Sequence, residues 1–359
     1  MATPKLFSPG PVDVSAQTYA AMAQTMIGHR GSEFEALYAS LQPGLQQMFG
    51  TVRPVFTSTS SAWGVMEGAL RNLAREKVLC LCCGAFSDKW LDVAKKCGFA
   101  ADSVQVEWGE AIDPEVVRAK LAEGGFDTVT FIHSETSTGV LNDLAGIAKV
   151  VKSFPDTLLI VDTVSSLSTV PTPMDALGID VMLAGVQKAL ALPPGLAVFA
   201  ISDAALERAK GTSNRGYYFD FIEFEKNAKA NNTPSTPAIS LLWGLQFMLG
   251  EIEKEGFEAR FARHATTNAM VHAWAARHGF EHFAPEGRRS TALTCFKTPD
   301  GFDLSGFIKT LKNNHGFLIN GGYGRIKGTT FRISNMGNET EATLAELIAA
   351  MDQVLAGMA

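Results

Sequence analysis

The sequence predicts an α/β protein, with a large domain built on a mostly parallel sheet between helices and a smaller C-terminal α+β domain. Short apolar segments alternate with helical segments from Val52 to about residue 201, which is typical of a parallel sheet covered on both faces. After Gly279 this alternation gives way to a different order of strands and helices. The length of 359 residues also suits two domains.

The first 15 residues are expected to form an extended arm, either a surface tail or a segment that lies across a cleft. Residues 7–11 read Phe-Ser-Pro-Gly-Pro, and two prolines around a glycine disfavour a helix. Helices are expected at 15–26 and 32–48. In the loop between them, Arg30 is expected to pair with Glu33, and a ligand contact is the alternative.

The central region alternates strands and helices in an order that predicts the sheet. Strands are expected at 55–56, 78–82, 103–106, 127–132, 158–161, 180–184 and 196–201. Helices are expected from the turn at 57–62 to Leu73, from the turn at 84–86 to Lys96, and at 114–122 and 143–153. Because ligands of open α/β sheets bind outside the carboxyl ends of the strands, polar residues that directly follow these strands are candidates for a site.

The C-terminal part begins within a long helical region. Residues 211–235 are rich in Gly, Asn and aromatic residues and are expected to form a loop, followed by a helix from about Pro237 and another from Glu258 to His278. Further elements are expected at 291–296 (strand), 303–314 (helix), 317–319 and 329–333 (strands) and 339–356 (helix). The predicted division is therefore an arm at 1–15, a large domain at 16–255 and a small domain at 256–359.

Composition excludes several classes of function. The chain is 46% hydrophobic and 19% charged with a net charge of −6, so neither nucleic acid nor an anionic membrane is an expected partner. No apolar run reaches the roughly 20 residues that a membrane span needs, and the N-terminus lacks a signal-peptide pattern. Cys80, Cys82 and Cys83 fall in one strand-like run and are expected to be buried free thiols, not metal ligands. No metal is predicted, and a cytoplasmic location is expected.

Two of the predicted strands deliver a charged residue to the same edge of the sheet. The apolar run 158–161 ends at Asp162, and the run 181–184 ends four residues before Lys188. The two side chains could form a structural ion pair. They would equally suit pyridoxal phosphate, which needs a lysine amine for a Schiff base and an acid that keeps its ring nitrogen protonated.

Four further patterns follow predicted strands or lie within one. The turn at 59–64 places Ser61, Ala62 and Trp63 at a helix N-terminus, where an anion or a plain helix cap is expected. Phe86 could stack on a planar ring or belong to the core. In the motif 133–139, Ser137 or Thr138 could bond to a cofactor or lie in a solvent loop. Arg332 lies in a short apolar strand and could receive a carboxylate or face water.

Together these patterns resemble the class V aminotransferases of fold type I, and most of all the alanine–glyoxylate and serine–glyoxylate (serine–pyruvate) group. The resemblance covers roughly residues 5–355. It rests on Ser-Pro-Gly-Pro at 8–11, His-Ser-Glu-Thr-Ser-Thr-Gly at 133–139, Val-Asp-Thr-Val-Ser-Ser at 161–166, Gln-Lys-Ala-Leu at 187–190, Pro-Pro-Gly-Leu at 193–196 and Phe-Arg-Ile-Ser-Asn-Met-Gly at 331–337.

The resemblance implies roles for these residues toward pyridoxal 5′-phosphate. Lys188 matches the Schiff-base lysine that also shuttles the substrate proton, and Asp162 matches the partner of the ring nitrogen. Arg332 matches the arginine that receives the substrate α-carboxylate. The remaining matches are cofactor contacts: Ser61, Ala62 and Trp63 at the phosphate, Phe86 on the ring face, Ser137 near the ring hydroxyl, Gln187 beside the lysine, and Asn232 and Ser235 from the second subunit of a homodimer with shared active sites.

The implied activity is the transamination of a small amino acid, of the alanine or serine type, to a 2-oxo acid such as glyoxylate or pyruvate. A 2-aminoethylphosphonate–pyruvate transaminase is one alternative, with Arg30, Arg325 or Lys327 as extra positive charges. A lyase of the cysteine desulfurase type is another, although residues 296–359 contain no cysteine and Gln187 precedes the lysine. A non-catalytic binding protein is disfavoured because each position that would carry the chemistry holds a competent residue.

Overall fold

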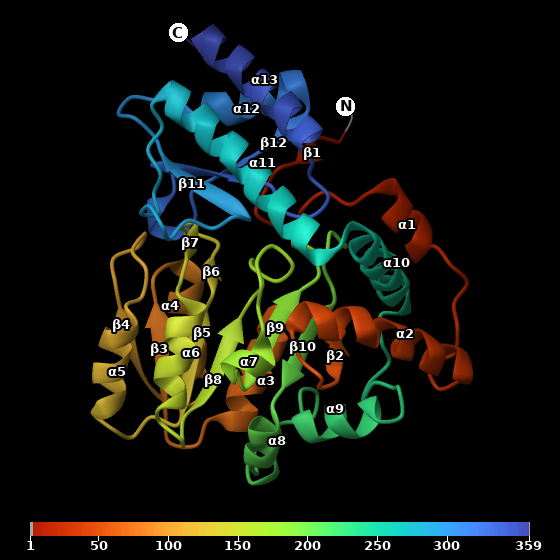
Figure 1. Ribbon diagram of the computed structural model, residues 1–359. Coiled ribbons are helices and arrows are strands. Elements are labelled where there is room, and N and C mark those ends of the chain that lie inside the picture. Colours follow the sequence, from red (N-terminus) through yellow and green to blue (C-terminus); the bar gives the residue numbers. More distant parts are fainter. Residues whose placement is uncertain (1–2, 359) are drawn as a thin grey trace.

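A seven-stranded sheet forms the centre of the larger part of the molecule (Figure 1). The computed structural model describes residues 3–358. In sheet order the strands are β2 (Val55–Ser58), β10 (Ala197–Ile201), β9 (Val181–Gly185), β8 (Leu158–Asp162), β5 (Thr128–Ile132), β3 (Lys77–Cys82) and β4 (Ala100–Gln105). β10 runs antiparallel to both neighbours, and all other neighbouring pairs are parallel. The predicted α/β class with a mostly parallel sheet is confirmed.

Helices cover both faces of this sheet because most of its strands are apolar on both faces. All five residues of β5, β8, β9 and β10 are buried. The helices of this part are α1 (Ala16–Met22), α2 (Ser32–Phe49), α3 (Ala62–Leu73), α4 (Ala85–Lys96), α5 (Pro114–Ala122), α6 (Leu144–Lys152), α7 (Met174–Leu177), α8 (Asp203–Lys210), α9 (Phe221–Ala228) and α10 (Ile239–Glu255). Right-handed crossovers require α3 and α4 on one face and α5, α6 and α7 on the other, because the chain reverses direction along the sheet after β4.

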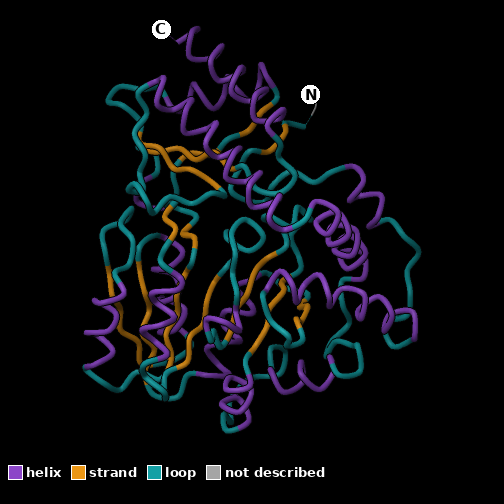
Figure 2. Tube along the Cα trace, in the orientation of Figure 1, coloured by secondary structure: helices purple, strands orange, loops and turns teal. Residues whose placement is uncertain are grey.

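Residues 257–358 form a second set of elements, here called the C-terminal group. It contains α11 (Phe257–His278), β11 (Leu293–Lys297), α12 (Leu304–His315), β12 (Phe317–Leu318), β13 (Asn320–Gly321), the 3₁₀ turn Gly324–Ile326, β14 (Thr330–Ser334) and α13 (Glu341–Met358). β11, β14 and β13 form an antiparallel sheet. A separate apolar cluster lies here, around Trp274, Phe331 and Leu344. Loops lie between the central sheet and this group (Figure 2).

The N-terminal arm joins the two parts of the molecule. β1 (Lys5–Leu6) pairs in parallel with β12, and Phe7 is fully buried in the apolar cluster of the C-terminal group. Further along the arm, the Val12 amide donates to the Gln187 carbonyl at 3.1 Å. Of the two alternatives for the arm, the structure shows the segment that lies across a cleft, because Gly10 and Pro11 line the cavity described below, and not a surface tail.

Most predicted elements lie within a few residues of the observed ones, and two predictions are wrong. Residues 211–235 are not all loop, because they contain α9, which begins where the Asp220 side chain accepts a hydrogen bond from the Ile222 amide. Arg30 does not pair with Glu33. Its guanidinium donates instead to the Asn232 side chain and to the Thr233 carbonyl, both at 3.2 Å, so contacts that are distant in sequence replace the local one.

Short elements were also missed, namely α7, α8 and β13, together with the two-stranded hairpin of β6 (Ser134–Glu135) and β7 (Val140–Leu141). The predicted boundary near residue 255 lies where α10 ends and α11 begins, and the three-part division remains a prediction. Across residues 3–358, no helix is both long and apolar enough to cross a membrane.

Replacing Leu344 by alanine should test the separate core of the C-terminal group. Leu344 is fully buried in that cluster, so the truncation should lower the free energy of unfolding by about 2–5 kcal/mol. The measurement is urea unfolding followed by tryptophan fluorescence. Val116→Ala is the control, because Val116 is 49% exposed on α5 and its truncation should change stability by about 0.5 kcal/mol or less. Equal losses in the two variants would contradict the assignment.

Candidate active site

A cavity of about 280 Å³ opens at the carboxyl ends of the parallel strands. Asp162 ends β8, and Gln187 and Lys188 follow β9. The first turns of α3 and α4 contribute another part of the wall, with Ser61, Ala62, Trp63 and Phe86. The sheet therefore brings seven of the predicted site residues together around one space, at the edge where ligands of such sheets bind.

Asp162 is a buried carboxylate with one oxygen open to the cavity. Its Oδ1 accepts a hydrogen bond from the Val164 amide at 2.8 Å; within residues 3–358 no hydrogen bond to Oδ2 is formed, although the nearby Trp90 indole N–H lowers the pKa of the carboxyl group. Burial raises the pKa of Asp162 to about 7, although the Val164 amide lowers it. A protonated nitrogen placed in the cavity would therefore supply the cationic partner that the carboxylate lacks.

Lys188 lies on a tight turn beside the arm. The Ala191 amide donates to the Lys188 carbonyl at 2.8 Å, and Nζ of the lysine donates to the Pro9 carbonyl. Burial and the positive charge of Arg332 together lower the pKa of Lys188 to about 8, although the Asp162 and Glu135 carboxylates act in the opposite direction. A lowered pKa increases the fraction of neutral amine at physiological pH, which a nucleophilic or basic lysine needs.

The structural ion pair between Asp162 and Lys188 is not formed. Among the residues described, no nitrogen–oxygen distance within 4.0 Å joins these two side chains. The arm keeps the amine close by: Gly10 has φ +126°, and a Cβ at this position would come within 2.5 Å of Lys188 Nζ. Only glycine therefore allows the arm to pass so near to the lysine.

The N-terminus of α3 faces the cavity with unused donors. Ser61 is the N-cap residue, and its side chain makes no capping hydrogen bond. The first amides of a helix have no acceptor within the helix, so those of Ala62 and Trp63 are available to an anion. Lys89 lies 5.1 Å from the centre of the Trp63 ring and adds positive charge nearby.

Phe86 presents its ring to the cavity and is supported from behind. Tyr323 stacks on it with a centroid distance of 5.1 Å and an interplanar angle of 16°. The buried Glu135 carboxylate accepts hydrogen bonds from the Phe86 amide at 3.4 Å and from the Ser87 amide at 2.9 Å. These contacts fix the first turn of α4 and thereby the direction of the aromatic ring.

Ser137 lies behind the cavity wall and not beside the cavity. Its hydroxyl donates to Glu135 at 2.6 Å and accepts from the Ala85 amide at 2.9 Å. Ser134 and Thr136 of the same motif line the cavity instead. The geometry thus gives Ser137 a supporting position, because its hydroxyl is already engaged in two protein hydrogen bonds.

Arg332 does not line this cavity but bonds to Thr136, which does, and itself lines a neighbouring hollow. Its Nη1 donates to the Thr136 carbonyl at 3.2 Å, while Nε and Nη2 donate to the Gly321 carbonyl at 3.3 and 3.2 Å. The guanidinium carries five N–H groups, so two are left for a ligand. The guanidinium carbon also lies 5.8 Å from the centre of the Tyr323 ring.

Asn232 and Ser235 lie apart from the cavity within the single chain. Asn232 accepts the hydrogen bond from Arg30, and Ser235 lines a separate small hollow with Thr57 and Thr59. Their predicted contact with a cofactor comes from a second subunit and therefore remains a prediction.

Sequence reasoning missed Glu135, Tyr323 and the Pro9 carbonyl as parts of the site. Glu135 lies in the 133–139 motif, where an acid directly after a buried strand was the available signal. Tyr323 lies in the glycine-dense segment 320–324, which precedes the strand of Arg332 and whose glycines are compatible with a simple turn. Nothing in the local sequence indicates that the Pro9 carbonyl accepts a hydrogen bond from the Lys188 amine, because the two residues are separated by nearly half of the chain.

Comparisons with known proteins agree with this geometry. The family model described as aminotransferase class-V matches residues 13–327. The serine–glyoxylate aminotransferase of Arabidopsis thaliana is 31% identical over 362 residues, covering 98% of this chain and 90% of the relative. The L-aspartate–glyoxylate aminotransferase of Paracoccus denitrificans is 30% identical over 364 residues, covering 98% and 91%. The crystal structure of an alanine–glyoxylate aminotransferase from Nostoc sp. superimposes with a TM-score of 0.94 at 28% identity, covering 99% of this chain and 96% of the other.

The raised pKa of Asp162 predicts an unusual pH dependence for the ligand-free protein. Burial raises the pKa of Asp162 from 3.8 to about 7, so between these two pH values the folded state keeps the proton that the unfolded state releases. Stability from this group is therefore present below about pH 4 and is lost as the pH rises to about 7. Asparagine does not titrate, so replacing Asp162 by asparagine should remove this loss of stability. The unfolding free energy of D162N minus that of the wild type should therefore increase by about 2–4 kcal/mol from pH 4 to pH 8.

The measurement is unfolding of both proteins between pH 4 and pH 8. Asp300→Asn serves as the control, because Asp300 is exposed and its substitution removes a carboxylate that stays in water. Stability curves for the wild type and D162N that run parallel over this range would show that burial does not raise the pKa of Asp162.

Proposed function

Because this chain belongs to the class V aminotransferases, we propose that it transfers the amino group of a small amino acid, of the alanine or serine type, to a 2-oxo acid such as glyoxylate or pyruvate. The family depends on pyridoxal 5′-phosphate, and the protein is a pyridoxal-phosphate-dependent enzyme of fold type I. The names of the three relatives all include glyoxylate, which supports a 2-oxo acid acceptor of this size.

The observation that carries the proposal is the pair formed by Asp162 and Lys188 on one cavity without a bridge between them. A buried carboxylate with a free oxygen suits the ring nitrogen of the cofactor, and an amine with a lowered pKa suits its aldehyde. When bound, the cofactor supplies a conjugated ring that stabilises negative charge at the substrate α-carbon. The residues present therefore fit the group that the family uses.

The remaining wall would hold the cofactor in place. The amides of Ala62 and Trp63, with the hydroxyl of Ser61, are the proposed phosphate ligands, because the helix dipole of α3 favours an anion there. Phe86 is proposed to cover one face of the ring, and Gln187 to contact it beside Lys188.

The proposal includes a second copy of the chain. Asn232 and Ser235 would reach the phosphate of the partner's site in a homodimer with shared active sites. Ser137 would act through Glu135 and Ala85, since its hydroxyl is occupied by them. The five cysteines are free thiols, which supports the proposed cytoplasmic location.

Two side chains are proposed to carry the reaction on the substrate. Lys188 would hold the cofactor covalently through its amine, and the same amine, being weakly basic, would accept the proton from the substrate α-carbon. Arg332 would bind the α-carboxylate through its two unused N–H groups and so hold the C–H bond within reach of Lys188.

Of the alternatives, the phosphonate reaction has one supporting observation, since Lys327 lines a hollow together with Arg332, and the desulfurase reaction has none among the described residues. The 2-aminoethylphosphonate reaction would need a positive group for the phosphonate, yet Arg325 is exposed and pairs with Glu107 at 3.3 Å. A desulfurase would need a reactive thiol, whereas burial raises the pKa of the Cys295 thiol to about 12. A panel of donors with glyoxylate and with pyruvate decides between alanine, serine and aspartate and tests 2-aminoethylphosphonate alongside them.

Replacing Lys188 by alanine should abolish turnover, because both the covalent attachment and the proton transfer depend on its amine. The check combines a transamination assay with borohydride reduction and peptide mass spectrometry, which should find the reduced cofactor on Lys188 in the wild type only. Lys254→Ala is the control, since Lys254 is exposed on α10. Retained turnover in K188A would refute the proposed role.

Replacing Arg332 by glutamine should raise the KM of the donor and lower kcat/KM by about 10- to 100-fold, the effect of losing a charged hydrogen bond of about 1.5–3 kcal/mol. Steady-state kinetics with alanine and serine measure this. Arg277→Gln is the matched control on exposed α11 surface. Binding of the cofactor, followed by its absorbance, should remain in R332Q, and an unchanged donor KM would exclude Arg332 as the carboxylate ligand.

A further inference from the structure

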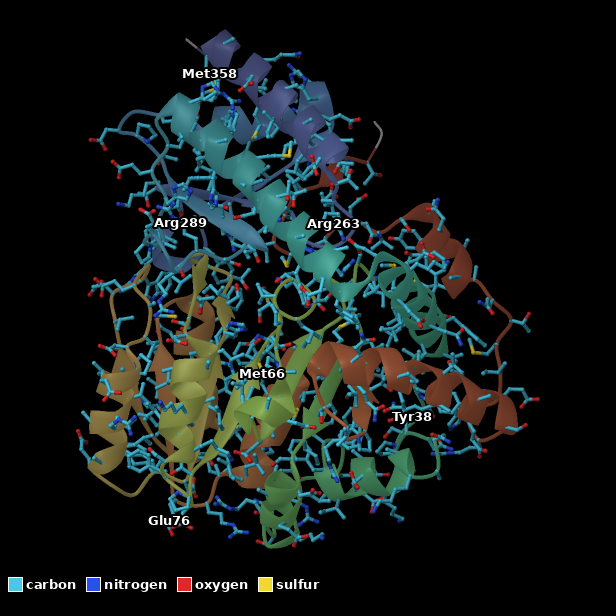
Figure 3. All side chains as sticks on the ribbon, in the orientation of Figure 1. Tyr38, Met66, Glu76, Arg263, Arg289 and Met358 are labelled. Atoms are coloured by element: carbon cyan, nitrogen blue, oxygen red, sulfur yellow. The ribbon has the colours of Figure 1, made fainter. Side chains whose placement is uncertain are left out.

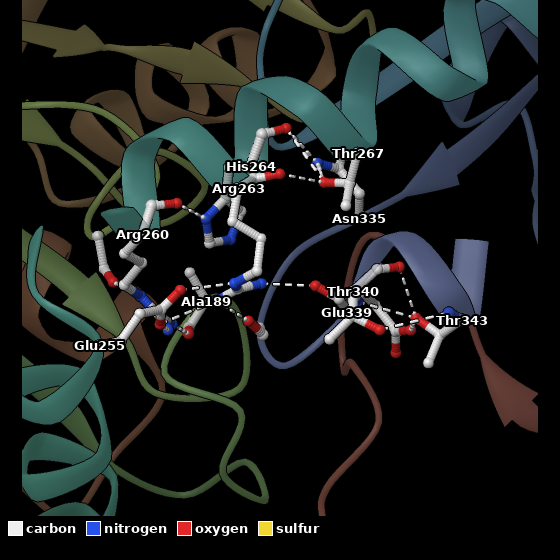
Figure 4. Close-up of polar contacts among 12 residues, drawn as sticks. Ala189, Glu255, Arg260, Arg263, His264, Thr267, Asn335, Glu339, Thr340 and Thr343 are labelled. Atoms are coloured by element: carbon white, nitrogen blue, oxygen red, sulfur yellow. Dashed lines mark hydrogen bonds and ion pairs between the residues drawn. The ribbon is translucent and has the colours of Figure 1, made fainter. Parts of the chain in front are cut away.

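Two arginines share one carboxylate where α10 is followed by α11 (Figure 4). One of them, Arg263, is labelled on α11 in Figure 3. Glu255, the last residue of α10, accepts from Arg260 Nη1 at 2.9 Å and from Arg263 Nε at 2.6 Å. The Arg260 side chain is only 2% exposed. A buried guanidinium is stable only if its donors are engaged, so the partners of Arg260 are informative.

The other donors of Arg260 contact the two loops that carry the proposed catalytic groups. Nη2 donates to the Ala189 carbonyl at 2.5 Å, directly after Lys188. Nε donates to the Ser168 hydroxyl at 2.5 Å, in the loop that follows Asp162. One rigid guanidinium thus joins both loops on the side away from the cavity.

Each of the two loops contains a residue in a strained backbone conformation, which contacts from other parts of the chain have to stabilise. Ser168 has φ +68° and Ala191 has φ +50°, in the left-handed region that non-glycine residues rarely adopt. Such a conformation costs roughly 1–2 kcal/mol per residue. Arg260 bonds directly to Ser168, and its Ala189 contact lies within the same turn as Ala191.

Arg263 extends the same network to the segment that follows Arg332. Its Nη1 donates to the Glu339 carbonyl at 2.5 Å, and its Nη2 donates to the Gly337 carbonyl at 3.2 Å. Gly337 has φ +83° and packs on the lysine turn, where a Cβ would lie 3.2 Å from Ala191 Cβ. The Glu255 carboxylate therefore couples the turn of Lys188 to the strand end of Arg332.

We propose that Arg260 is a positioning residue of the reaction, which holds the Lys188 turn and the Asp162 loop in fixed relation to each other through Ala189 and Ser168. It touches neither substrate nor cofactor. This inference rests on the proposed roles of Lys188 and Asp162. A misplacement of about 1 Å at a reacting group can reduce a rate about 100-fold, so a distant hydrogen-bond donor can control turnover.

The test compares Arg260→Lys and Arg260→Met with Arg277→Lys and Arg277→Met, substitutions of an exposed arginine on the same helix. For each holoenzyme, kcat and donor KM are measured together with the visible circular dichroism of the bound cofactor, relative to its absorbance. The R260 variants should lose about 10- to 100-fold in kcat with donor KM changed by about twofold or less, because Arg332 is untouched. Their dichroism should decrease as the ring loses its fixed orientation.

A purely structural role predicts a different result. The R260 variants would then lower the melting temperature while kcat and the dichroism of the folded fraction stay at the wild-type value, and this would overturn the proposal. If R260M does not fold, R260K and Ser168→Ala test the proposal instead. Each removes only part of the hydrogen bonds that Arg260 forms with Ser168 and Ala189, and S168A leaves the bond to the Ala189 carbonyl in place. Unchanged kcat and dichroism in both would equally overturn it.

The dichroism needs no substrate, so the test of Arg260 is separate from the test of the proposed reaction. A wild-type protein that binds the cofactor on Lys188 but transfers no amino group would refute the proposed function. Even then, a weaker cofactor dichroism in R260K than in R277K would still support Arg260 as the positioning residue.

Discussion

The site depends on a carboxylate that is buried and, among residues 3–358, forms no ion pair. Asp162 has one amide partner, a free oxygen and a pKa raised by burial. Lys188 could have neutralised it, but the amine is bonded to the arm and no ion pair forms. The fold thus maintains an uncompensated negative group and a weakly basic amine on one cavity, and this arrangement is stable only because the surrounding sheet fixes both strands.

Hydrogen bonds behind the cavity maintain that separation. Glu135 fixes the turn of Phe86, and Arg260 fixes the turns of Lys188 and Ser168. Each of these charged groups is buried and satisfied by several partners, which is the condition under which buried polar networks add rigidity. The cavity wall therefore consists of short loops, and buried hydrogen bonds on the far side of these loops from the cavity fix their geometry.

The fold and the main site residues could be predicted because their signals are local. Apolar runs such as 158–161 mark strands, and the residue after each run marks the ligand edge. The positions of Arg30 and Ser137 could not be predicted in this way. Arg30 has a nearby acid in sequence, but the chain brings Asn232 to it, and Ser137 is turned toward Glu135. Helix α9 was missed because Phe221 and Phe224 are buried by contacts from distant elements.

The arm has a consequence for how the molecule is made. Lys5 pairs with Phe317, and the Ser334 amide donates to the Phe7 carbonyl at 2.9 Å. Both contacts join the arm to strands that are made much later than the arm, so the arm cannot reach its folded position when it is first synthesised. The sheet can form earlier from neighbouring segments, whereas the arm reaches its place over Lys188 only after these late contacts exist. Nascent chains therefore carry an open, incomplete cavity until the strands β12 and β14 have been made.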